Sequence, residues 1–166
     1  MRYTTAGGNH LFNVQPFTAE LAHGAIAVAH NGNLVNADEL RTQLVADGAI
    51  FSSSSDTEVF LHLIARSKEE SSLTARVLSA LVQAEGAFSL LIMTRSALYA
   101  ARDRHGLRPL ALGRLGETWV LASETCAFDL IGAEYERDIA PGEVVEIGLD
   151  GSLVSHFPFE QTAPSP

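Results

Sequence analysis

The chain has 166 residues, 46% of them hydrophobic and 19% charged, which is typical of one globular domain with a sizeable core. Lys and Arg number 11 against 20 Asp and Glu, and the resulting net charge of −9 disfavours nucleic acid and anionic membrane surfaces as partners. A single cysteine excludes an internal disulfide, and the sequence carries neither an apolar run of membrane-spanning length nor a signal-peptide layout, so we expect a cytoplasmic protein.

The first half of the chain predicts one strand followed by three helices. The apolar run at residues 24–30 is typical of a strand covered on both faces, and the segment His30-Asn31-Gly32-Asn33 after it predicts a sharp turn. Asn36 is the predicted N-cap of the first helix, and Gly48 ends that helix. Helices are predicted at residues 36–47, 57–67 and 72–85.

The second half changes to alternating apolar and polar residues, which predicts antiparallel hairpins. Strand pairs are predicted at 87–94 with 97–103, at 108–115 with 118–123, and within 142–157 about Asp150-Gly151. A short helix is predicted at 126–133. Helices followed by hairpins favour an α+β layered domain over a doubly wound sheet.

Asn31 and Gly32 are a candidate donor pair. A glycine exposes its backbone N–H to a ligand, and the neighbouring carboxamide offers a second donor; two converging neutral donors form an oxyanion hole for acyl transfer. Asn-Gly is also a common turn pair, so a purely structural turn remains an alternative.

Two charged residues complete a possible ligand set. Asp56 precedes a predicted helix, where it either caps the helix or binds an ammonium group. Arg2 is either a solvated surface residue or a bidentate partner for a carboxylate. A carboxylate binder, an ammonium binder and an oxyanion donor pair together fit a free α-amino acid with a reactive side-chain carbonyl.

Several blocks of the sequence resemble one family when taken in order. The blocks are RYTTAGG, NVQPF, IAVAHNGNLVNADELR, SSDTEVFLHLIAR, GAFSLLIMT, ARDRHGLRPLALG and ASETCAFDLIGAEYERDIAPGEVVEI. They are similar to the class II glutaminase domain of amidophosphoribosyltransferases, glutamine-dependent enzymes of purine synthesis, from Arg2 to about residue 156. The resemblance implies the αββα sandwich of N-terminal-nucleophile hydrolases. Related glutaminase domains, such as that of glucosamine-6-phosphate synthase, look similar over HNG and TE and remain an alternative.

The resemblance also implies a role for each candidate residue. Arg2 would hold the α-carboxylate of glutamine, with Tyr3 and Thr4 shaping that pocket. Asn31 and Gly32 would form the oxyanion hole, and Asp56 would bind the α-ammonium group. No pattern of metal ligands is present in the sequence, so no metal is expected in this chain.

The sequence departs from the family pattern at its beginning. The family's nucleophile is an N-terminal cysteine upstream of the RYTTAGG block, and here that block starts at Arg2, so we expect the nucleophile, its strand and the first helix to be absent and the sandwich to be incomplete. Cys126 is expected to be a buried structural thiol. The chain as given is therefore expected to be an inactive partial glutaminase domain (residues 1–157), or a non-catalytic glutamine-binding or interaction module.

The resemblance implies further parts outside the chain. Residues 158–166 would begin a linker toward a phosphoribosyltransferase domain, which would bind phosphoribosyl pyrophosphate with Mg²⁺. The intact enzyme is expected to be a homo-oligomer, and the sequence does not decide whether it carries an iron–sulfur cluster.

Overall fold

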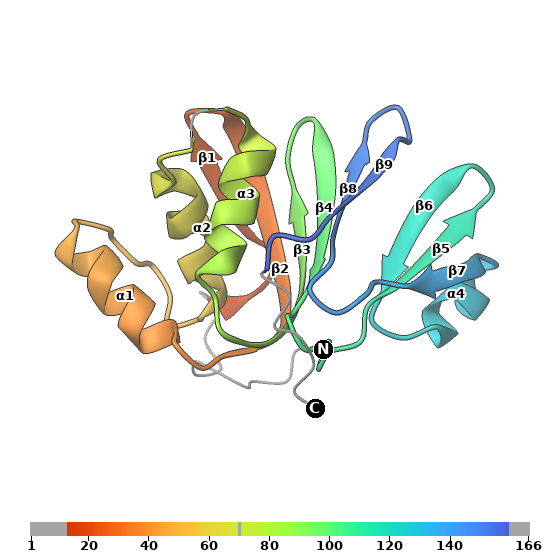
Figure 1. Cartoon of the computed structure of the whole chain (residues 1–166), viewed down its shortest axis with the longest axis horizontal. Helices are drawn as coiled ribbons and strands as arrows, with labels where there is room; N and C mark the ends of the chain where they lie inside the picture. Colours follow the sequence, from red (N-terminus) through yellow and green to blue (C-terminus); the bar gives the residue numbers. More distant parts are fainter. Residues whose placement is uncertain (1–12, 70, 160–166) are drawn as a thin grey trace.

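Two antiparallel sheets form the centre of the molecule (Figure 1). The computed structural model describes residues 13–69 and 71–159. The first sheet contains, in spatial order, β1 (Phe17–Leu21), β2 (Gly24–Leu34), β3 (Gly86–Met93), β4 (Ala97–Arg102), β8 (Val144–Gly148) and β9 (Leu153–His156). The second sheet contains β6 (Thr118–Ala122), β5 (Ala111–Leu115) and β7 (Glu134–Asp138) in that order.

Helices cover the outer faces of the two sheets. α1 (Ala37–Ala46), α2 (Thr57–Arg66) and α3 (Leu73–Val82) lie on the side of the first sheet, and Figure 1 shows α2 and α3 in front of β1 and β2. The short α4 (Cys126–Ile131) lies by the second sheet, where the ring of Phe128 packs near Gly113 of β5. The order helices, sheet, sheet, helix is the expected αββα sandwich. Among the described residues, no helix has the length and apolar character needed to cross a membrane.

The hydrophobic core has two layers because successive side chains of a strand point to opposite faces. On β4, Tyr99 and Ala101 join the large cluster between the first sheet and the helices, while Ala100 joins a smaller cluster between the two sheets. Leu112 of β5 and Val145 of β8 complete the smaller cluster from opposite sides. Apolar packing thus holds the two sheets together.

The structure confirms the three predicted hairpins and the helices, but it corrects the prediction around HNGN. β2 continues through His30, Asn31 and Gly32 as far as Leu34 and pairs with β3 along this length, so no sharp turn is present. The reason is tertiary: β3 supplies an antiparallel partner to the polar segment, which local sequence cannot reveal. Asn36 does occupy the N-cap position of α1, but its side chain makes no cap bond.

Two strands were not predicted. β1 pairs with the first half of β2, and β7 pairs with β5 at an edge of the second sheet. β7, with the sequence EYERD, carries charged residues on an exposed edge and so lacks a hydrophobic alternation.

Candidate functional site

The backbone direction of Gly32 follows from its partner strand. Gly32 lies opposite Phe88 of β3. The carbonyl of Phe88 accepts a hydrogen bond from the N–H of Asp103 (2.8 Å), and its N–H donates to the Asp103 carboxylate (3.2 Å), so both groups of Phe88 point away from β2. The pair is therefore one of the non-hydrogen-bonded pairs of an antiparallel ladder, and the N–H of Gly32 points to the other edge of β2.

Alternate N–H groups share this edge of β2. The N–H of His30 donates to the side-chain oxygen of Gln15, and the N–H of Leu34 donates to Oδ2 of Asp56 at 3.0 Å. The N–H of Gly32 lies between them. Since a strand rises about 3.4 Å per residue, the N–H groups of Gly32 and Leu34 are about 7 Å apart. A backbone donor and a carboxylate thus occupy neighbouring places on one strand edge.

A glycine is also required at position 32 for packing. A Cβ atom there would lie 2.0 Å from the carbonyl oxygen of Ala87 and 2.7 Å from Cα of Phe88, and the φ angle is +151°. Other L-residues rarely adopt this backbone conformation. The close approach of β2 to β3 therefore requires a glycine at position 32.

Asp56 is buried, with 6% of its surface exposed, and it does not cap α2 through its side chain. Its Oδ1 lies 3.5 Å from Nδ1 of His30. Burial opposes the charged form, but hydrogen bonds from His30 and from the N–H groups of Leu34 and Thr57 favour it, and the pKa of Asp56 is lowered. Asp56 is therefore a buried carboxylate that stays ionised at neutral pH, and it occupies the N-cap position of α2 without a side-chain cap bond.

The loop that leads to Asp56 is held by one glutamate. The carboxylate of Glu58 accepts hydrogen bonds from the backbone N–H and the hydroxyl of both Ser52 and Ser53, at 2.6–2.9 Å. Burial acts to raise the pKa of Glu58, but these donors outweigh it and lower the pKa. The polar loop is thus a fixed support for Asp56.

Asn31 faces the second sheet. Its exposed side chain donates from Nδ2 to Oγ of Ser123, which follows β6, at 3.2 Å. The contact closes a hollow of about 180 Å³ that Gln15, His30, Asn31, Ser89 and Ser123 help to line. Asn31 and Gly32 thus offer their donors from adjacent residues, one toward the second sheet and one along the edge of β2.

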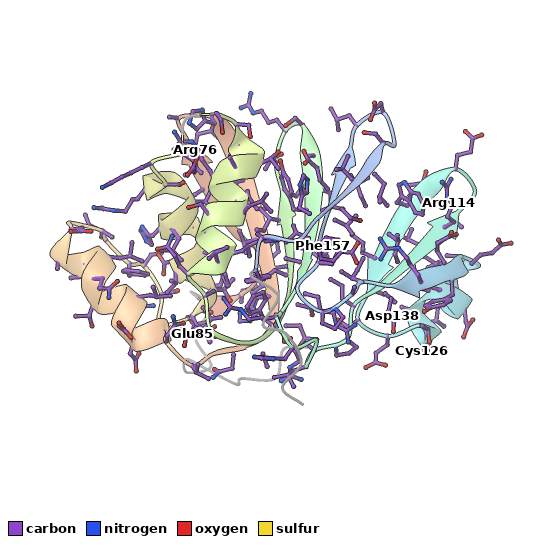
Figure 2. The ribbon with its side chains drawn as sticks, in the orientation of Figure 1. Arg76, Glu85, Arg114, Cys126, Asp138 and Phe157 are labelled. Atoms are coloured by element: carbon purple, nitrogen blue, oxygen red, sulfur yellow. The ribbon has the colours of Figure 1, made fainter. Side chains whose placement is uncertain are left out.

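The remaining predicted site residues lie outside the described part of the chain. Arg2, Tyr3 and Thr4 fall within residues 1–12, so the carboxylate-binding role of this group stays a prediction. Cys126 is described, and the prediction that it is buried is wrong: the thiol is exposed, at the end of the molecule formed by the second sheet and α4 (Figure 2). Helix α4 begins at this residue.

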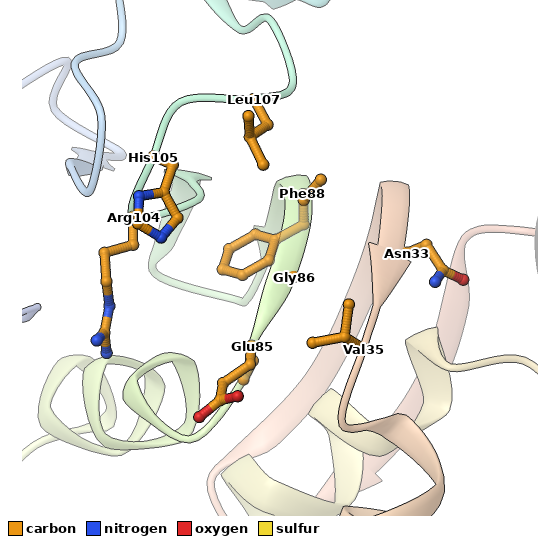
Figure 3. Close-up of a pocket in the computed structure, with 10 residues that line it drawn as sticks. Asn33, Val35, Glu85, Gly86, Phe88, Arg104, His105 and Leu107 are labelled. Atoms are coloured by element: carbon orange, nitrogen blue, oxygen red, sulfur yellow. The ribbon is translucent and has the colours of Figure 1, made fainter.

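A second cavity lies beyond the same end of β2. It has a volume of about 470 Å³, and Figure 3 shows His105 and Leu107 on one side of it and Val35 on the other. None of Asn31, Gly32 and Asp56 lines it. Within the described residues, no group of three His, Cys, Asp or Glu side chains that could hold a metal ion is found.

Asp103 holds the loop that forms one wall of this cavity. Its fully buried carboxylate accepts hydrogen bonds from the N–H groups of His105 and Leu107 at one oxygen, and of Phe88 and Arg108 at the other. The contributions of Gln15 and Ser123 to the site were missed, because nothing near them in the sequence indicates contact with β2.

Comparison with known proteins connects this geometry to a family. A model of the glutamine amidotransferase domain matches residues 10–129, more than half of the chain. An amidophosphoribosyltransferase of Rhizobium etli is 53% identical over 92% of this chain, and that of Bacillus subtilis is 47% identical over 95%. The chain spans only 31% and 33% of the lengths of these two relatives.

A solved structure gives the same result for the fold. The structure of glutamine phosphoribosylpyrophosphate amidotransferase from Bacillus subtilis, complexed with ADP and GMP, superposes with a TM-score of 0.90 at 44% identity. The match covers 96% of this chain and 34% of that one. The αββα sandwich implied by the sequence is therefore confirmed, and the chain belongs to the glutamine amidotransferase domain family.

Proposed function

We propose that the chain is the glutamine-binding part of an amidophosphoribosyltransferase. In this proposal Asp56 binds the α-ammonium group of glutamine, and Asn31 and Gly32 donate to its amide oxygen. Arg2, with Tyr3 and Thr4, binds the α-carboxylate. The similarity to amidophosphoribosyltransferases over more than nine-tenths of the chain supports this choice over the glutaminase part of another amidotransferase.

The observation that carries the proposal is the shared edge of β2. The N–H of Gly32 lies on that edge about 7 Å along the strand from the N–H of Leu34, which the ionised Asp56 accepts. This span is comparable with the separation between the ammonium nitrogen and the amide oxygen of an extended glutamine. A buried carboxylate with a lowered pKa attracts a cationic group, and neutral donors suit the oxygen of an amide.

The chemistry of the complete enzyme follows from these positions. A thiolate attacks the amide carbon, and negative charge develops on the oxygen that faces Asn31 and Gly32. The intermediate collapses once its nitrogen has gained a proton, which releases ammonia, and water then hydrolyses the thioester to glutamate. We assign the thiolate, and the transfer of ammonia to phosphoribosyl pyrophosphate in the presence of Mg²⁺, to parts of a longer homo-oligomeric enzyme.

Calorimetric titration with two ligands tests the role of Asp56. Glutaramate is glutamine without the α-amino group, so the ratio of the two affinities isolates the ammonium contact. We expect this chain to prefer glutamine by about tenfold or more, since a hydrogen bond between charged groups contributes about 1.5–3 kcal/mol. Asp56→Asn keeps an acceptor for the N–H of Leu34 and should abolish the preference.

Asp38→Asn is the matched control. Asp38 is exposed in the first turn of α1, so this variant loses the same charge away from the site and should keep the preference for glutamine. If Asp56→Asn also keeps the preference, Asp56 does not bind the ammonium group and the proposed arrangement is wrong.

A further inference from the structure

His30 is buried beside the proposed ammonium site. Its side chain is 1% exposed and points from β2 toward α2. The imidazole meets the ring of Phe60 edge-on, with the ring centres 5.9 Å apart and the planes at 79°. The ring therefore has little freedom, and its two nitrogens have fixed surroundings.

The two nitrogens differ in their partners. Nδ1 lies 3.3 Å from the hydroxyl of Thr57 and 3.5 Å from Oδ1 of Asp56. Nε2 is buried, and within residues 13–69 and 71–159 no hydrogen-bond partner reaches it. Nδ1 therefore faces two oxygens, whereas Nε2 has no hydrogen-bond partner among the described residues.

These surroundings select one protonation state. An imidazolium, or the neutral form with its proton on Nε2, would bury an N–H group without an acceptor, which is rare in folded proteins. In the form with its proton on Nε2, the lone pair of Nδ1 would also face the carboxylate of Asp56, and two negative regions repel each other. The form with its proton on Nδ1 donates to an oxygen and leaves only a lone pair unpaired.

The hydroxyl of Thr57 belongs to a wider network of polar groups around His30. It lies 3.1 Å from the hydroxyl of Ser55 and 3.4 Å from the side-chain nitrogen of Gln15, which acts as a donor to it. Gln15 also accepts the backbone N–H of His30. The network thus joins the edge of β2 to the start of α2 through neutral groups.

We propose that His30 is a positioning residue, neutral with its proton on Nδ1, which orients the carboxylate of Asp56 without neutralising its charge. This inference rests on the proposed function, in which Asp56 binds the ammonium group. An imidazolium at this place would compete with the ligand for the same charge. The neutral ring instead holds Oδ1 while the N–H of Leu34 holds Oδ2, and the negative charge remains for the substrate.

Nuclear magnetic resonance of the unmodified chain tests the protonation state. Long-range ¹H–¹⁵N correlation on uniformly ¹⁵N-labelled protein at pH 7.5 distinguishes protonated from bare ring nitrogens. The signals of His30 are identified by their loss in a His30→Asn variant. We expect a protonated Nδ1 and a bare Nε2; a proton on Nε2, alone or together with Nδ1, would overturn the inference.

Two substitutions test the positioning role. His30→Asn keeps a donor near the place of Nδ1, whereas His30→Leu keeps bulk without a donor. We expect His30→Leu to lower the preference for glutamine over glutaramate by about tenfold, and His30→Asn to retain most of it. If both variants lose the preference for glutamine over glutaramate, or if both keep it, His30 does not position Asp56 through Nδ1.

The two proposals fail in different ways. If the unmodified chain shows no preference for glutamine while Nδ1 carries the proton, the proposed function fails and the arrangement of His30 stands. If Nε2 carries the proton while glutamine is still preferred, only the inference about His30 fails.

Discussion

Replacement of Gly32 by alanine tests the link between strand packing and the proposed donor. The added Cβ would lie 2.0 Å from the carbonyl oxygen of Ala87 and 2.7 Å from Cα of Phe88. Both atoms belong to the backbone of β3, so no side-chain rotation can relieve the contact. β2 and β3 must separate locally, at the centre of the first sheet.

The expected loss of stability has two contributions. Strain of a non-glycine residue at a φ of +151° costs about 1–3 kcal/mol. The forced separation of packed strands costs about 1–3 kcal/mol more. The sum of about 2–6 kcal/mol is a large part of the stability of a typical domain, which is about 5–15 kcal/mol.

Gly48→Ala supplies the control. Gly48 has a φ of +87°, and nothing lies within 4 Å of the Cβ position, so only strain of about 1–2 kcal/mol is expected. Urea unfolding followed by far-ultraviolet circular dichroism gives both values. If Gly32→Ala costs no more than Gly48→Ala, the strands do not approach as described, and the reasoning about the direction of the Gly32 N–H fails with them.

Three further predictions follow from other parts of the structure. Asp103→Asn should cost about 3 kcal/mol or more in urea unfolding, because one carboxamide oxygen cannot accept the four N–H groups that the carboxylate accepts; a loss below about 1 kcal/mol would contradict this. Burial acts to raise the pKa of Glu143, but hydrogen bonds led by that of Arg137 lower it below 4.5. The ionised Glu143 therefore stabilises the folded chain above pH 4.5, and this contribution is lost as the pH falls through the lowered pKa of Glu143. Glu143→Gln should make the free energy of unfolding depend less on pH in this range. An unchanged pH dependence in the variant would refute the prediction. The chain as given should release no ammonia from glutamine, because Cys126 is exposed on α4 and is not the nucleophile; turnover that Cys126→Ala abolishes would reverse that assignment.

Local patterns in the sequence predict most of the elements. The amphipathic segment at 57–67 and the hairpin about Asp150-Gly151 appear in the structure close to their predicted bounds, because helical and two-residue periodicities depend on side chains near in sequence. The ordered blocks of similarity also identify the family and the candidate residues Asn31, Gly32 and Asp56. β7 could not be predicted in this way, because an exposed and charged edge strand has no apolar alternation.

The sequence by itself thus determines which residue types stand at the candidate site. Only the tertiary structure decides how they are used. The N–H of Gly32 points away from β3 because Asp103, far along the chain, takes both backbone groups of Phe88. Asn31 meets Ser123 because two sheets pack against each other. Such contacts depend on the register between strands and on packing between layers, and neither is a property of a short stretch of sequence.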